Sequence, residues 1–319
     1  MKGLNIDAVA GIDVLLNEML TLVPSTALSE RVGGVREEER GKLTKGKNVT
    51  TNVSSNVRIT YNKEIAGKHD LTFGGNMDYY MADVDNVSIT GYGVGTQMSP
   101  ALINQSITGN RKPSAGSHKE KTAQLGVGLV AGYSFATTYD FFATYKADAS
   151  SVLPKDKRWN AAWAVGLGWT VSQYPFLKDN KFITRLNLKA SYGQMANLAG
   201  VSASSTIGTF SYSTSYYGNA RLLQLAELYN TDLKPEQTIT TDFSLSVEFF
   251  KRLTLDANIY RRETTDALLD VPVPLSNGFS TMKRNIGILR NEGFELSALV
   301  KLFDTTDWRM SLRGSFICK

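Results

Sequence analysis

The sequence of 319 residues predicts an all-β protein, specifically part of an antiparallel transmembrane β-barrel. Three observations support this fold class: apolar and polar residues alternate along the predicted strands, the strands are long, and the connections alternate between short and long. Ordinary strands have about 5 or 6 residues, whereas these have about 9 to 15. Crossing the hydrocarbon at a tilt takes about 9–11 residues, so the lengths favour a membrane wall.

The order of the predicted elements has a turn side and a loop side. Eleven strands are expected, near residues 4–14, 55–62, 69–81, 121–135, 139–148, 159–172, 182–194, 238–249, 253–262, 292–303 and 307–317. Three-residue turns are expected at 136–138, 250–252 and 304–306. Long loops are expected at 15–54, 82–120, 195–237 and 263–291. An antiparallel sheet alone does not require this asymmetry, but a transmembrane barrel has it.

The segment 159–171 shows the two-residue period most clearly. Its odd positions are Trp, Ala, Trp, Val, Leu, Trp and Val, and its even positions are Asn, Ala, Ala, Gly, Gly and Thr. From 182 to 192 the apolar set of Phe, Thr, Leu, Leu, Ala and Tyr opposes Ile183, Arg185, Asn187, Lys189 and Ser191. Because successive side chains of a strand point to opposite faces, one face is apolar and the other is small, polar or charged.

Aromatic residues gather near both ends of the predicted strands. Trp159 and Trp169 lie ten residues apart, which is about 33 Å along a strand and about 25 Å vertically once the strand tilts. That spacing fits two interfacial girdles, although core aromatics of a soluble β-protein are the alternative. The predicted membrane-interface aromatics are Tyr133, Phe135, Tyr139, Phe141, Trp159, Trp163, Trp169, Tyr192 and Trp308.

Composition excludes several classes of protein. Cys318 is the only cysteine, which rules out an intrachain disulfide and a cysteine-rich metal site. His69 and His118 lack the spacing of metal ligands. The net charge of +5 is scattered, so no basic surface for nucleic acid is expected. The glycines Gly126, Gly128 and Gly132 have no helix after them, so we expect them to leave room on the polar face rather than bind phosphate. We expect no catalytic residues, no cofactor and no enzyme activity.

The N-terminus enters the alternating pattern directly. It shows no charged segment followed by an apolar stretch and a small-residue cleavage site. The sequence therefore predicts no signal peptide, and we interpret the chain as a piece of a longer outer-membrane protein.

Residues 148–177 bring the sequence close to a known family. The segment contains Asp148, Ser150-Ser151, Arg158-Trp159, Gly168-Trp169 and Phe176-Leu177 in that order. Later blocks are 188–194, 230–238, 285–287 and 290–296. In order and spacing, residues from about 140 to 319 resemble the barrel of SusC/RagA-type TonB-linked outer-membrane transporters of Bacteroidetes. Ala149 and Met195-Ala196 depart from the family pattern.

The resemblance implies a barrel of about 22 strands filled by an N-terminal plug. Residues 1–319 would then be a single barrel portion without the plug, the TonB-contacting segment and the signal peptide. It also implies a location in the outer membrane, a SusD-like surface lipoprotein as partner, and contact with the TonB complex only through the missing N-terminal region. The expected function is nutrient import, with oligosaccharides as the first expected substrate and peptides as the second. A passive porin and a secreted β-rich binding protein are the alternatives.

Aromatic residues in the predicted long loops are candidates for contact with ligand or with the lipoprotein. They are Tyr212, Tyr216, Tyr217 and Phe279. Tyrosines bury much area at low entropic cost, which suits a binding surface. The same residues could instead stabilise the loop itself.

Overall fold

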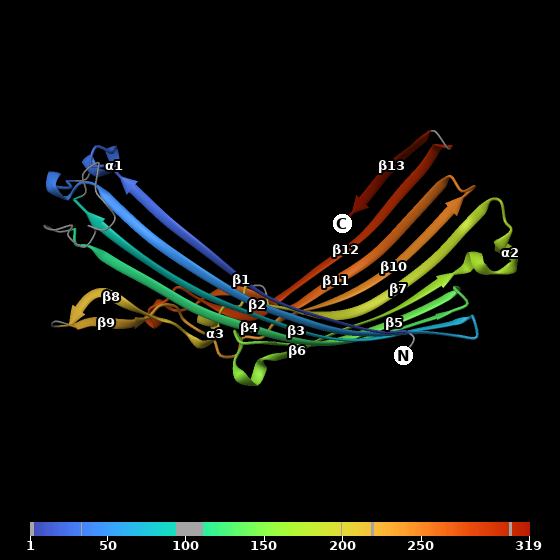
Figure 1. The fold of residues 1–319 in the computed structure, drawn as a ribbon, viewed down its shortest axis with the longest axis horizontal. Helices are drawn as coiled ribbons and strands as arrows, with labels where there is room; N and C mark the ends of the chain where they lie inside the picture. Colours follow the sequence, from blue (N-terminus) through green and yellow to red (C-terminus); the bar gives the residue numbers. More distant parts are fainter. Residues whose placement is uncertain (1–2, 33, 94–110, 199, 218–219, 306–307) are drawn as a thin grey trace. The chain divides into compact units, whose positions relative to one another are not determined.

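The computed structural model describes residues 3–32, 34–93, 111–198, 200–217, 220–305 and 308–319. Eleven strands form one sheet in which neighbours follow the order of the chain (Figure 1). They are β1 (Leu4–Val23), β2 (Lys42–Ile65), β3 (His69–Tyr92), β4 (Ser114–Phe135), β5 (Tyr139–Ser150), β6 (Trp159–Thr170), β7 (Ile183–Asn197), β10 (Glu236–Phe249), β11 (Leu253–Pro272), β12 (Thr281–Asp304) and β13 (Arg309–Cys318). A separate hairpin consists of β8 (Phe210–Tyr217) and β9 (Ala220–Leu225).

In the part of the chain that the structure describes, helices occur as short pieces in the connections. They are α1 (Leu28–Arg31), η1 (Glu37–Glu39), η3 (Lys155–Lys157), η4 (Val171–Gln173), α2 (Pro175–Lys178), α3 (Ala203–Ile207) and η5 (Leu275–Asn277). Within the described residues, none of them has the length and apolar character needed to cross a membrane.

The predicted all-β class and the eleven strands of the main sheet are confirmed, but the extent of the long loops is wrong. Strands occupy much of 15–54, 82–120 and 263–291, so those connections shrink to 24–41, 93–113 and 273–280. The connection near 195–237 contains the unpredicted hairpin β8–β9. Beyond the apolar band both faces of a strand meet water, so the period-two contrast disappears while Thr and Val still favour extended backbone.

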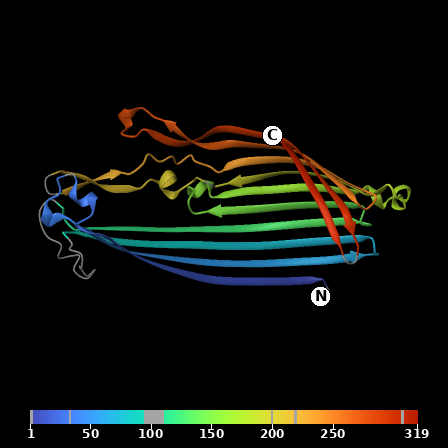
Figure 2. The same ribbon diagram turned by 90° about the horizontal axis from the view of Figure 1, so that it is seen from above.

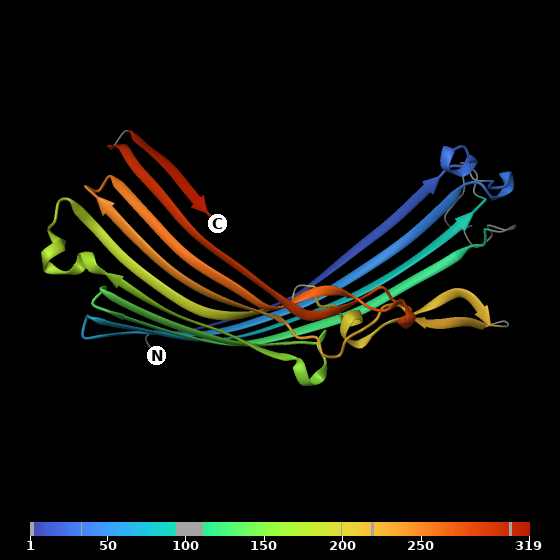
Figure 3. The ribbon, with the colours of Figure 1, turned by 180° about the vertical axis from the view of Figure 1, so that it is seen from behind.

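The chain divides into two compact units. Unit 1 comprises Met1–Ala8, Asn56–Asp78 and Gln124–Lys319, and unit 2 comprises Val9–Ser55 and Tyr79–Ala123. In unit 1 the recorded strand pairs from β4 to β13 are all antiparallel. Figures 2 and 3 show these strands side by side, with α2 and the hairpin β8–β9 at opposite ends of the unit.

The apolar face of unit 1 is uncovered by protein. Leu129 and Leu167 are 60% and 61% exposed in mid-strand. The buried apolar side chains larger than alanine in the described residues are five, Leu43, Leu153, Val171, Leu233 and Pro235, and they lie near strand ends or in connections. Soluble proteins rarely expose such continuous apolar surface, and lipid is the solvent that suits it. The predicted division into two faces is therefore present in the structure.

The opposite face carries a polar network over β2 to β5. The Asn56 and Asn76 amides donate to the Asp78 carboxylate, and the Lys146 ammonium lies 2.9 Å from Asp148 and 3.9 Å from Asp78. Glycines make the room that the sequence suggested. A Cβ at Gly126 would lie 2.5 Å from Asp148 Oδ1, and one at Gly128 would meet the Asn76 amide. Gly132 shows no such crowding, since its nearest neighbour is the Thr72 side chain at 3.5 Å.

An ion pair joins the connections of unit 2. Arg111 Nη1 lies 2.5 Å from Glu30 Oε2, and the Gly41 N–H donates to the same oxygen at 3.1 Å. The Arg111 guanidinium also lies over the Tyr92 ring, 4.3 Å from its centroid. The hydrogen bond from Arg111 holds the pKa of the Glu30 carboxyl below its ordinary value, against the raising effect of burial. Glu30 thereby links the segment 24–41 to the entry of β4.

The facing assignment predicts unequal costs for arginine at two valines of β4. Val127 is on the apolar face and Val130 on the polar face, with exposed fractions of 43% and 42%. Val127→Arg should cost about 2–4 kcal/mol in a bilayer, because the guanidinium would enter hydrocarbon. Val130→Arg should cost less. Urea unfolding from lipid vesicles measures both variants, and equal penalties would contradict the assignment. Gly128 is a poorer control because Asn76 fills its space.

The Glu30 pair predicts acid-sensitive protection of the Gly41 amide. Because the pKa of Glu30 is lowered by folding, its stabilisation is complete above the unfolded value of about 4.3 and is lost as pH falls through the folded value. Glu30→Gln should loosen the segment by about 1–3 kcal/mol at neutral pH. Hydrogen exchange at Gly41, corrected for intrinsic rates, measures this. The exposed Glu37→Gln is the control, and an equal effect of both variants would refute the role of Glu30.

Candidate functional site

Three connections of unit 1 meet at the end of the sheet opposite α2. They are the β5–β6 turn, the β7–β10 connection and the loop-side part of the β11–β12 hairpin. Leu153 and Leu233 are fully buried there, with Thr206 at 1% exposure. We call the group of Leu153, Thr206, Asn230, Leu233 and Asn285 the loop node. It is the main place in unit 1 where described loop side chains build a small core.

The β5–β6 turn supplies the first part of the loop node. The Ser150 N–H donates to the Arg158 carbonyl at 3.2 Å, and Arg158 Nε donates to the Leu153 carbonyl at 3.3 Å. Thr206 Oγ1 of α3 donates to the Val152 carbonyl at 2.6 Å. Ser150 and Arg158, noticed in the sequence as part of a motif, are therefore residues that shape this turn.

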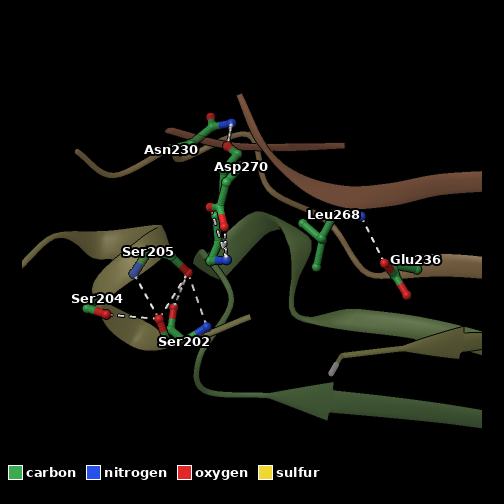
Figure 4. A network of polar contacts seen from close by, with 8 residues as sticks. Ser202, Ser204, Ser205, Asn230, Glu236, Leu268 and Asp270 are labelled. Carbon is green, nitrogen blue, oxygen red and sulfur yellow. Dashed lines mark hydrogen bonds and ion pairs between the residues drawn. The ribbon is translucent and has the colours of Figure 1, made fainter. Parts of the chain in front are cut away.

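Helix α3 is held by a capping box. Ser202 Oγ accepts from the Ser205 N–H at 3.2 Å, and Ser205 Oγ accepts from the Ser202 N–H at 3.1 Å (Figure 4). The Ser205 carbonyl then accepts from the Asn230 N–H at 2.8 Å. Both ends of the β7–β10 connection are joined in this way, because Ser205 lies early in it and Asn230 lies late.

Asn285 connects the same region to the β11–β12 hairpin. Its Oδ1 accepts from the Lys234 N–H at 3.0 Å, and its Nδ2 donates to the carbonyls of Lys234 and Asp266, each at 2.8 Å. Asp266 has a positive φ of 56° and lies in a register shift between Thr264 and Ala267. The Lys234 ammonium pairs with its carboxylate at 2.8 Å. These contacts stabilise a bulge, and a bulge redirects the strand beyond it.

Further polar contacts join the end of the β7–β10 connection and the start of β10 to the β11–β12 hairpin. Glu236 Oε1 accepts from the Leu268 N–H at 2.8 Å, and Asn230 Nδ2 donates to the Lys283 carbonyl at 3.0 Å (Figure 4). The Lys283 ammonium lies 3.2 Å from Asp270. The sequence blocks 148–159, 230–238 and 285–287 thus converge on one node. Sequence reasoning missed this, although each buried leucine stands close before a proline in a mostly polar segment, Leu153 directly before Pro154 and Leu233 two residues before Pro235, and this was an available signal.

The hairpin β8–β9 carries the predicted loop tyrosines. Tyr212 is opposite Leu223, Tyr216 opposite Arg221 and Tyr217 opposite Ala220. Tyr217 is 82% exposed, while the side chains of Tyr212 and Tyr216 lie outside the described part of the structure. Phe279 is half-buried in the β11–β12 connection. An isolated two-stranded hairpin is marginally stable in water. The loop node supports this hairpin, because the chain on both sides of β8–β9 belongs to the loop node.

The predicted interface aromatics lie in two groups on the apolar face. On the turn side Tyr133 is opposite Phe141, Phe135 is opposite Tyr139, and the Tyr139 and Trp169 rings stack at 6.5 Å. On the loop side the Trp163 and Tyr192 rings meet edge to face at 5.5 Å. Trp159 and Trp308 are exposed. The structure therefore brings most of the set together in two rows at different levels of the sheet.

The polar face of β7 and β10–β13 contains a hollow of about 560 Å³. Its lining includes Arg185, Asn187, Lys189, Asp256, Asn258 and Glu295. Such side chains can hydrogen-bond a polar ligand or a polar protein surface. No group of three or more His, Cys, Asp or Glu side chains in the described segments is arranged to hold a metal ion.

Comparison with known proteins places these features in a family. Residues 25–317 match the family described as TonB dependent receptor-like, beta-barrel. The chain is 31% identical to TonB-dependent receptor P39 of Formosa agariphila over 176 residues, 53% of this chain and 16% of that receptor. It is 30% identical to TonB-dependent receptor SusC of Bacteroides thetaiotaomicron over 191 residues, 56% of this chain and 19% of SusC.

A solved structure shows the same fold. The chain superposes on the RagAB peptide transporter with a TM-score of 0.85 and 23% identity, over 99% of this chain and 34% of that one. The chain spans less than a third of the length of the curated relatives it matches. The match to SusC and the RagAB fold confirm the SusC/RagA-like resemblance. The chain belongs to the TonB dependent receptor-like β-barrel family.

Proposed function

We propose that this chain forms part of the barrel wall of an outer-membrane importer that takes up nutrients with energy from the TonB complex. The observation that carries the proposal is the division of the sheet into an uncovered apolar face and a polar face with a hollow of about 560 Å³. An importer wall needs lipid on one side and a polar passage on the other. The family match over residues 25–317 supports the same conclusion.

The two aromatic rows are proposed to lie at the two membrane interfaces. Tyr and Trp rings favour the headgroup level because they are apolar with a polar tip. The stacked Tyr139–Trp169 pair would mark the turn-side interface, and the Trp163–Tyr192 pair the loop-side interface.

We propose that the loop node holds the hairpin β8–β9 in position, and that this hairpin contacts a SusD-like lipoprotein and the nutrient. The exposure of Tyr217 and the hydrogen bonds from Asn230 and Asn285 support this role. We infer an oligosaccharide as the nutrient, because tyrosine rings can stack on sugar rings and the polar face offers carboxylates and amides for hydroxyls. A peptide is the second candidate, since the matched RagAB structure is titled a peptide transporter.

A passive porin and a secreted binding protein are the competing functions, and an enzyme is not proposed. Uptake that stops when the TonB complex is removed would exclude the porin. Extraction from membranes only by detergent would exclude the secreted protein.

The tyrosines provide the first test of the proposal. Replacing Tyr212, Tyr216 and Tyr217 with Ala should slow growth on the cognate oligosaccharide severalfold, without lowering the amount of barrel in the outer membrane. The measurement is the growth rate of a strain in which the complete natural polypeptide carries the three substitutions. The triple Phe variant is the control, because it keeps the rings. If barrel abundance falls in step with growth, the tyrosines are structural.

Asn285 provides the second test. Asn285→Ala removes three hydrogen bonds to backbone groups, which should cost about 1–3 kcal/mol locally. Hydrogen exchange at the Lys234 amide should accelerate, and uptake should fall while membrane insertion stays normal. Asn277→Ala, an exposed change on the same hairpin, should leave both unchanged. If hydrogen exchange at the Lys234 amide accelerates in Asn285→Ala but uptake is unchanged, the loop node has no role in transport.

A further inference from the structure

Aromatic rings at the turn side of unit 1 continue past the strand ends into the turns. The Tyr174 ring of the β6–β7 connection meets Trp169 at 6.3 Å and Phe176 at 5.8 Å. In the β10–β11 turn, the Phe250 ring meets Phe182 edge to face at 4.8 Å. Phe176 and Phe250 are 71% and 59% exposed. We call these five residues, with Phe249, the turn cluster.

The backbone at Phe250 shows that its ring is placed at a cost. Phe250 and Lys251 have φ of 54° and 59°, a left-handed conformation that disfavours L residues by roughly 1–2 kcal/mol each. Asn and Gly are the residues expected at both positions of such a hairpin turn. Ala136 and Thr137 of the β4–β5 turn have the same conformation, so it belongs to these tight hairpin turns and not to one kind of side chain. At the β10–β11 turn the strained position presents a large side chain to the outside. Here that side chain is an exposed aromatic ring at the end of the apolar face.

Cations without carboxylate partners flank the turn cluster. Lys178, Lys181, Lys251 and Arg252 are exposed, and none takes part in an ion pair among the residues that the structure describes. Asp179 is the acidic residue in the same segment. The turns also touch, because the Phe250 N–H donates to the Phe182 carbonyl at 2.9 Å and the Lys251 N–H donates to Thr184 Oγ1 at 3.3 Å. Lys181 precedes one of these contacts and Lys251 makes the other through its backbone, so the cations belong to two adjoining turns.

Two arginines toward the loop side of the same unit have carboxylate partners within the protein. Arg261 lies 3.1 Å from Glu263 and 3.4 Å from Glu292, and Arg290 lies 2.8 Å from Glu263. Those two guanidinium groups are neutralised by carboxylates of the protein. The four cations at the turn cluster have no such partner among the described residues, so they are available to anions from outside the chain.

We propose that the turn cluster and its four cations bind the phosphates of phospholipid headgroups in the leaflet at the turn side. The apolar face leads directly to the turn cluster, so the rings lie at the depth of the headgroups. Lysine and arginine stems can follow the apolar surface and place their charge at the phosphates. The proposal concerns lipid and goes beyond transport, and it stands whichever nutrient is imported.

The test uses the polypeptide as the cell makes it, folded into vesicles of phosphatidylcholine, of phosphatidylcholine with phosphatidylglycerol, and of phosphate-free galactolipid. The variant Lys181→Gln/Lys251→Gln/Arg252→Gln removes three cations of the turn cluster. The control Lys112→Gln/Lys155→Gln/Arg284→Gln removes two lysines and one arginine from exposed loop-side positions. Urea unfolding gives the folding equilibrium in each lipid.

Wild type and control should fold more favourably in phospholipid, most of all with phosphatidylglycerol, than in galactolipid. The turn variant should lose this preference by about fivefold per cation, on the order of a hundredfold in total. A turn variant that keeps the preference, or a control that loses as much, would overturn the proposal. If the triple variant does not fold in any vesicle, Lys251→Gln alone carries the same test, with an expected change of about fivefold.

Phe250→Asn tests the ring separately. Asn suits the positive φ at this position, so the turn itself should tolerate the change. We expect the folding equilibrium in phospholipid vesicles to fall despite the relief of strain. An increase would show that the strained turn is incidental and that the Phe250 ring makes no useful contact with lipid.

Discussion

Backbone hydrogen bonding is the constraint on which the rest of this structure depends. In hydrocarbon each unpaired N–H or C=O costs several kcal/mol, so membrane-spanning strands must pair along their whole length. The recorded ladders satisfy this requirement where it matters. Register shifts in unit 1 occur near strand ends at Glu248/Phe249 and Lys301/Phe303, and in the loop-side half of β11 at Thr264/Ala267 and Ala267/Leu268. Pairing between them is continuous, for example from Leu253–Val300 to Thr264–Leu289.

Because backbone hydrogen bonds hold the strands together, the sheet does not need a hydrophobic core between layers. The apolar face meets lipid, and the polar face is shaped by small residues. Glycine allows large rings to lie against the sheet, as Phe142 does over Gly166 and Tyr260 over Gly293. The same arrangement leaves carboxylates, amides and lysines accessible around the hollow on the polar face. The proposed importer wall rests on these two different solvents on the two faces of one sheet.

Outside the membrane the constraint changes, since loops in water need packing of their own. The loop node provides it with two buried leucines and a set of hydrogen bonds from Asn285, Asn230 and Thr206. Connections far apart in the chain thereby become one platform beneath the hairpin β8–β9. Short polar motifs, which carry no periodic signal, are the residues that build this platform.

The sequence by itself determined the fold class, the eleven strands and the facing of most side chains, because lipid and water impose a two-residue period inside the membrane. Segments 148–177, 230–238 and 285–287 resembled a family, yet nothing local showed that Leu153, Leu233 and Asn285 would meet. Only the tertiary structure decided the strand extensions beyond the apolar band, the loop node, the bulge at Asp266 and the contact of Phe250 with Phe182. The physical reason is that periodicity reports the solvent of each residue, whereas contacts between distant connections depend on how the strands bring their ends together.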